Sequence, residues 1–214
     1  IAICAWFYAE PVRQRGVSVT NGQMWPKYKS LLKNKQSILA GTFLFFTSCS
    51  PSVGTPIMAK MRDDLHLTKI YIGWLSTLGS IAGCAGAALY YFISRKINLK
   101  KWLIWGTILN AVSTVAYVYL TNTTVLVYAV AFGITGMFVQ LLLMDFMARS
   151  CPEGTEATTF ALLCSVVNFG GFLSGLTGSR LYATLGYDGL VWISGLTTLL
   201  CLAFIPFLKL KESR

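Results

Sequence analysis

Long apolar stretches alternate with short polar ones along most of this chain. Six of them are each about as long as the ~20 residues that an α-helix needs to cross the ~30 Å hydrocarbon core of a membrane. They cover residues 37–58, 70–93, 102–120, 125–146, 158–182 and 190–208. The pattern predicts six membrane-spanning helices, and the short connections predict that consecutive helices run antiparallel.

The remaining segments are different in character. Residues 1–9 are apolar but too few to span a membrane, and the chain starts on Ile1. We therefore expect 1–9 to be the end of a helix that begins before this chain. Residues 10–36 are polar and basic, and 209–214 form a short basic tail.

Composition places the chain in a membrane. Hydrophobic residues make up 55% of it and charged residues only 12%, whereas soluble domains average about 25% charged residues. If 10–36 is cytoplasmic, alternation puts fourteen of the 18 lysines and arginines on that side and four on the other. This asymmetry is the positive-inside pattern of membrane proteins. The net charge of +10 thus reflects topology, and we expect no nucleic-acid partner.

The residues offer no catalytic or metal-binding set. The six cysteines stand singly, and His66 is the one histidine. No nucleophile–base triad, zinc-peptidase motif or phosphate-binding glycine loop is present. We therefore expect a protein that is not an enzyme and that holds no cofactor and no metal.

Polar residues occur deep inside the predicted helix at 158–182. Glu156 and Arg180 are 24 residues apart, about 36 Å along a helix, so they bracket the hydrocarbon and Asn168 lies midway. Ser165 is about one turn earlier. An amide in lipid leaves its hydrogen-bonding groups unsatisfied, so Asn168 must face protein or water. Two interpretations remain open, a hydrogen bond between helices and a position lining a substrate path.

Three further positions are notable. Gln140 is a deep polar residue of the fourth predicted helix. Asp145 stands four residues before Arg149, which suits a structural ion pair, although an ionisable residue within a span is also a functional candidate. Pro51, in "SCSPSVGTP", removes a backbone donor and predicts a kinked or unwound helix, a feature that transporters use around their sites.

Small residues recur four apart in two predicted helices. The pairs are Gly79 and Gly83, Ala82 and Gly86, Gly171 and Gly175, and Ser174 and Gly178. Such rows let helices approach closely in lipid. They indicate either packing alone or helices that slide against partners.

Two stretches resemble the folate–biopterin transporter family. The first is "FLFFTSCSPSVGTPIMAKMRDDLHLTKIYIGWLSTLGSIAGCAGAALY", which has the family's Pro–Ser break and its Asp–x–Leu loop at Asp64–Leu65. The second, "CPEGTEATTFALLCSVVNFGG", resembles a signature that includes Cys151, Glu156, Ser165 and Asn168. In addition, "GAALYYFISRKINLKK" occupies the place of a conserved loop of the major facilitator superfamily, with Tyr90 or Tyr91 near its expected aspartate.

The resemblance implies an all-α membrane protein, the six-helix C-terminal half of a twelve-helix major facilitator fold. Residues 1–9 would then end transmembrane helix 6, 10–36 would be the central cytoplasmic linker, 37–208 the six-helix bundle and 209–214 a cytoplasmic tail.

It also implies a secondary active transporter, a symporter of folates or pteridines, in the plasma membrane or a plastid envelope. Its partners would be the lipid bilayer and the missing N-terminal half. The alternatives are a transporter of another organic solute and a receptor or scaffold that transports nothing.

On this interpretation, the expected site residues form two groups. The substrate-binding group is Asn168, Ser165, Gln140, Pro51 and Arg180, and the coupling or gating group is Asp145 and Glu156. Arg180 suits a folate carboxylate, but a long basic side chain also extends to a membrane interface on its own account.

Overall fold

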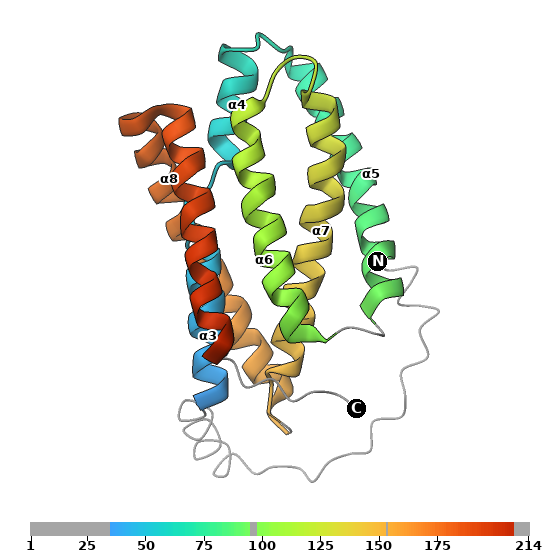
Figure 1. Ribbon diagram of the computed structural model, residues 1–214, viewed down its shortest axis with the longest axis vertical. Coiled ribbons are helices and arrows are strands. Elements are labelled where there is room, and N and C mark those ends of the chain that lie inside the picture. The colour runs from blue at the N-terminus through green and yellow to red at the C-terminus, as the bar shows by residue number, and fades with distance from the viewer. Residues whose placement is uncertain (1–34, 95–97, 153, 208–214) are drawn as a thin grey trace. The chain divides into compact units, whose positions relative to one another are not determined.

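The computed structural model describes residues 35–94, 98–152 and 154–207 (Figure 1), and within these ranges every regular element is a helix. The predicted helix end at 1–9, nearly all of the predicted linker 10–36 and the tail 209–214 lie outside the described residues. The helices are α3 (Lys35–Ser48), α4 (Gly54–Asp63), α5 (Lys69–Ser94), α6 (Leu99–Ala116), α7 (Val125–Arg149) and α8 (Glu156–Leu200). Two 3-10 segments, η1 (Tyr117–Tyr119) and η2 (Cys201–Phe207), continue α6 and α8.

Four helical segments of the described chain are long and apolar enough to cross a membrane. They are Lys69–Ser94, Leu99–Tyr119, Val125–Arg149 and Glu156–Phe207. The first three coincide with predicted spans to within a few residues at each end. Together these segments confirm the prediction of an all-α, multi-pass membrane protein.

The first predicted span, 37–58, is two helices rather than one. Helix α3 ends at Ser48 and α4 begins at Gly54, with non-helical backbone between them. Pro51 lies in the middle of this gap, where its missing N–H group and its ring oppose a continuous helix. The predicted break in this helix is thus confirmed. We call residues 49–53 the break.

Helix α8 contains the fifth predicted span and the first part of the sixth, which continues into η2. Its 45 residues would extend for about 68 Å if straight, twice the thickness of the hydrocarbon. The backbone is non-helical at Gly186, with φ 72° and ψ −174°. We call the part of α8 before Gly186 its first arm and the part after Gly186 its second arm. Ser174, in the first arm, and Ser194, in the second, both bond to Ser50. The second arm therefore folds back beside the first (Figure 1).

The connection expected at 183–189 is therefore not a loop. Residues 183–189 are helical on both sides of Gly186, and the reversal takes place at that glycine. A positive φ combined with an extended ψ is a conformation that essentially only glycine adopts. Hence one residue replaces a longer turn.

Small residues set two close helix contacts. Helix α5 packs closely on α7. A Cβ added to Gly79 would lie only 3.2 Å from the carbonyl oxygen of Ala129, and Gly86 lies against the carbonyl of Ile134. Helix α3 runs parallel to the first arm of α8, since Gly41 meets Leu163 and the chain around Ser48 meets Gly170. The parallel direction agrees with the predicted alternation of spans, in which the first and the fifth cross the same way.

Candidate binding cavity at the break in the first span

A cavity of about 340 Å³ lies beside the break, between α3, α4, α6, α7 and both arms of α8. Most of its wall is polar, and none of the described residues that line it carries a charged side chain. The polar lining residues other than Tyr117 are Thr47, Ser48, Ser50, Ser52, Asn110, Thr114, Ser174, Ser194 and Thr198. Such a concentration of hydroxyls within apolar helices is costly unless they are hydrogen-bonded.

Ser50 is the centre of the hydroxyl contacts. Its Oγ lies 3.1 Å from the carbonyl oxygen of Ser194 and 3.0 Å from the hydroxyl oxygens of both Thr197 and Thr198. On its other side, the Ser174 hydroxyl donates to the Ser50 carbonyl. One residue of the break is thus bound by both arms of α8.

The backbone of the break is also hydrogen-bonded to α8. The N–H of Ser52 donates to the carbonyl of Ser174 over 3.0 Å. Gly178, one turn after Ser174, lies against the backbone of Ser52, and no Cβ could fit there. Because Gly178 is small, α8 comes close enough for its Ser174 carbonyl to accept from the Ser52 N–H, which the break leaves without a partner in its own helix.

Of the predicted substrate-binding residues, Pro51 lines this cavity and is buried. Ser165 and Asn168 lie elsewhere, on an exposed face of the first arm of α8. The Ser165 hydroxyl donates to its own helix at Ala161, 2.9 Å away. The side-chain amide of Asn168 makes no hydrogen bond within the part of the chain that the structure describes.

Gln140 and Arg180 are likewise exposed, on α7 and on the first arm of α8. The structure does not bring the five predicted substrate-binding residues together around one cavity. Their roles in substrate binding stay predictions.

The two predicted gating residues have defined contacts. Asp145, on α7, accepts a hydrogen bond from the Tyr90 hydroxyl of α5 over 2.9 Å, and its other oxygen is 2.9 Å from Nε of Arg149. The predicted Asp145–Arg149 pair is thus confirmed. Tyr90 is one of the two tyrosines near the expected aspartate of the superfamily loop.

Glu156 begins α8 and folds back onto the preceding turn. Its Oε1 accepts a hydrogen bond from the N–H of Gly154 over 2.7 Å. Nearby, burial and then the Glu156 carboxylate raise the pKa of the Cys151 thiol. Cys151 consequently stays protonated at neutral pH, which agrees with a structural role for this turn.

Sequence reasoning missed the hydroxyls of the second arm of α8. Ser194, Thr197 and Thr198 fall within "SGLTT", in the middle of an otherwise apolar helix. This local density of hydroxyls could have identified them. Their partner, Ser50, could not be named, because it is more than 140 residues away in the chain.

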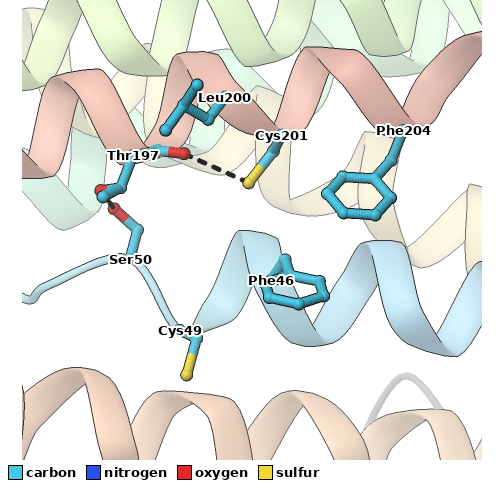
Figure 2. Close-up of a pocket in the computed structure, with 7 residues that line it drawn as sticks. All are labelled: Phe46, Cys49, Ser50, Thr197, Leu200, Cys201 and Phe204. Atoms are coloured by element: carbon cyan, nitrogen blue, oxygen red, sulfur yellow. Dashed lines mark hydrogen bonds between the residues drawn. The ribbon is translucent and has the colours of Figure 1, made fainter.

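A second cavity, of about 320 Å³, lies on the other side of Ser50 (Figure 2). Its wall is mainly apolar and includes Phe46, Leu200 and Phe204. The hydroxyls of Ser50 and Thr197 face each other at its edge, as Figure 2 shows. Ser50 lines both this apolar cavity and the polar one.

A multi-pass helical bundle with a broken helix beside a polar cavity is an arrangement that membrane transporters use around their sites. Comparison with known sequences agrees, because the profile of the Major Facilitator Superfamily matches residues 38–214. The chain belongs to this superfamily.

Three similar proteins point to one branch of it. The chain is 28% identical to a folate-biopterin transporter of Synechocystis sp. over 84% of this chain and 40% of that protein. It is 26% identical to folate transporter 1 of Plasmodium falciparum, over 65% of this chain and 30% of that protein. It is also 26% identical to probable folate-biopterin transporter 4 of Arabidopsis thaliana, over 64% and 30%. The resemblance to folate–biopterin transporters is confirmed, and the chain spans less than half the length of each of these relatives.

Proposed function

We propose that this chain is the six-helix C-terminal half of a secondary active transporter that moves folate- or pteridine-like solutes by alternating access. Residues 37–208 would form the half, 10–36 the cytoplasmic linker, 1–9 the end of helix 6 and 209–214 a cytoplasmic tail. The names of the similar proteins support the substrate class. The proposal assigns solute movement, and no catalytic chemistry, to the chain.

The observation that carries this proposal is an exposed face on the first arm of α8 that has polar and small residues beside the exposed ring of Phe172. Ser165, Asn168, Gly171 and Gly175 fall within about a third of the helix circumference, at ~100° per residue. Asn168 is exposed, and a Cβ on Gly171 or Gly175 would meet nothing within 4 Å. An amide is costly in lipid, so this face suits a second protein half and an aqueous path between the halves.

A scaffold that transports nothing would be expected to seal Asn168 between two of its own helices. Its exposed position favours transport instead. The proposal therefore retains Asn168, Ser165 and Gln140, all exposed, as substrate-path residues.

Asp145 serves as the gating residue of the proposal. It links the last turns of α5 and α7 through Tyr90 and lies one turn before Arg149. A link of this kind, near the cytoplasmic end of both helices, would hold them together in one state of the cycle and release them in the other.

Uptake measurements test the proposal. Cells that express the complete protein should accumulate labelled folate or biopterin, and Asn168→Leu should lower the uptake at equal surface expression. Thr177→Val is the matched control, because Thr177 is exposed about 180° around the same helix and its hydroxyl bonds its own helix at Leu173. Absence of uptake of both solutes by correctly inserted protein would overturn the substrate class. Full uptake by Asn168→Leu would remove Asn168 from the path.

Arg180 allows the two solutes to be distinguished. Folate carries carboxylates and biopterin carries none, and arginine is the side chain best suited to bind a carboxylate. If Arg180 binds substrate, Arg180→Met should reduce folate uptake and leave biopterin uptake unchanged. Equal effects on the two solutes would assign Arg180 to the membrane interface.

A further inference from the structure

We propose that the hydroxyl cluster around Ser50 binds a sodium ion, held by side-chain and backbone oxygens where α3 breaks. The inference deepens the proposed function by naming a coupling ion, and it rests on that function only for the coupling itself. Binding of the ion follows from contacts within this chain.

The first support is a shortage of protons among close oxygens. The Thr198 hydroxyl lies 2.8 Å from the carbonyl oxygen of Ser194, and the Thr197 hydroxyl lies 2.9 and 3.0 Å from the carbonyl oxygens of Ile193 and Ser194. Each threonine has one proton, which it can give either to its own helix or to Ser50.

Ser50 alone cannot donate a proton to each of the oxygens around it. It has one hydroxyl proton, yet three oxygens, those of Thr197, Thr198 and the Ser194 carbonyl, lie 3.0–3.1 Å from its Oγ. With the contacts of the two threonines to their own helix, six short oxygen–oxygen contacts share the three protons of Ser50, Thr197 and Thr198, so at least three contacts have no proton of their own, whichever hydroxyl donates. A cation among the oxygens converts that repulsion into attraction.

The second support is the pair of backbone carbonyls at the end of α3. In an unbroken helix, the carbonyls of Thr47 and Ser48 would accept from the N–H groups of residues 51 and 52. Pro51 has no N–H, and the N–H of Ser52 is bonded to Ser174. Thr47 and Ser48 both line the polar cavity, at the end of a helix where the backbone dipole is negative.

The lining also selects the kind of ion. Calcium and magnesium sites use carboxylates, and none of the described residues around this cavity has one. A proton needs a group that titrates near neutral pH, and hydroxyls and amides do not. Neutral oxygens on an interrupted helix suit a single charge, and transporters coordinate sodium with such unwound backbone.

The depth of the site favours retention of the ion. Ser174, Ser194 and Thr198 are each less than 8% exposed. The ligands come from the break and from both arms of α8, so the ion would tie together three segments that no single helix connects. Binding should therefore stabilise the protein.

Binding is measured on the purified complete protein, without folate or biopterin. We expect the melting temperature to rise saturably with NaCl when choline chloride keeps the ionic strength constant, and KCl to have a much smaller effect. Radioactive sodium should bind and be displaced by unlabelled sodium. A melting temperature that is equal in sodium, potassium and choline would overturn the proposal, whatever the variants do.

Variants locate the site. Thr198→Val keeps the shape of the side chain and removes one oxygen, so sodium binding should weaken by about tenfold or more, while Thr198→Ser should retain it. Ser50→Ala should have the same effect as Thr198→Val. Thr135→Val is the control, since the Thr135 hydroxyl makes the same bond to its own helix, at Ala131, but lies outside the cavity. Unchanged sodium binding in Thr198→Val or Ser50→Ala would place the ion elsewhere and overturn the assignment.

The two proposals fail separately. Sodium binding without folate or biopterin uptake would contradict the proposed substrate and leave the ion site intact. Uptake by a protein that binds no sodium would contradict the ion site alone.

Discussion

At the scale of single residues, the close contact between the backbones of α8 and the break depends on a glycine, Gly178. A Cβ on Gly178 would lie 2.9 Å from the backbone nitrogen of Ser52 and closer still to its carbonyl oxygen. Real Cβ atoms do not approach backbone so closely, so the helix would have to move away from the break. That movement would also stretch the neighbouring hydrogen bond from Ser52 to Ser174.

We therefore predict that Gly178→Ala destabilises the protein by ~1–3 kcal/mol, the usual cost of overpacking. Thermal unfolding of the purified protein measures the effect. Gly175→Ala is the control on the same helix, because a Cβ there meets nothing within 4 Å. It should leave stability unchanged or raise it by up to about 1 kcal/mol through helix propensity. Equal melting temperatures for the two variants would contradict the close approach at Gly178.

The sequence identified these small residues but not their roles. Both four-residue rows of the fifth span were visible, yet Ser174 and Gly178 pack against the break while Gly171 and Gly175 remain open. Spacing defines which residues share a face of a helix. It does not say which face meets a neighbour, because that depends on elements far away in the chain.

At the scale of elements, α4 is the half-helix that follows the break, and Lys60 attaches it to α8. The Lys60 ammonium lies 3.9 Å from the ring centre of Tyr187 and 3.7 Å from a carboxylate oxygen of Asp188. Its side chain is only 14% exposed. A cation over an aromatic ring contributes up to about 2 kcal/mol when it is desolvated.

Lys60→Met should loosen α4 while the pair of α5 and α7 stays intact. We expect faster amide hydrogen exchange in residues 54–63, since local stability sets the exchange of each element, and unchanged exchange in α5 and α7. A uniform increase over all helices would show a general loss of stability instead.

Arg62→Met is the matched control for this experiment. Arg62 is largely exposed, and its hydrogen bonds go to the adjacent Asp63, over 2.7 and 2.9 Å. These bonds lower the pKa of Asp63. The substitution should raise that pKa toward its ordinary value without changing exchange in α4.

The break itself was predictable, whereas the contacts of α4 were not. Pro51 in the middle of an apolar run predicts an interrupted helix from local chemistry alone. Lys60 follows the first predicted span, 37–58, and was therefore expected in a loop, whereas the structure places it in α4 with a largely buried side chain. Only the folding-back of α8 brings Tyr187 and Asp188 to it.

At the scale of the whole chain, six predicted apolar runs correspond to four candidate spans among the described residues. Helices α3 and α4, with 14 and 10 residues, are each too short to cross the ~30 Å of hydrocarbon alone. The last two runs form one helical segment, Glu156–Phe207, with a sharp reversal inside it. Hydropathy located all the apolar runs, but the two interruptions depend on backbone geometry at Pro51 and Gly186.

The reversal at Gly186 determines whether the cavity can form at all. It returns the second arm of α8 to the first, so that Ser174 and Ser194 can bind Ser50 from two sides. Gly186 has a φ of 72° and a ψ of −174°, which an alanine can adopt only with strain. We predict that Gly186→Ala destabilises the protein by ~1–3 kcal/mol, in thermal unfolding of the purified protein. Gly171→Ala, at an open helical position of the same element, should not. If Gly186→Ala were as stable as Gly171→Ala, the chain would reverse at another residue, and the placement of the second arm would be wrong.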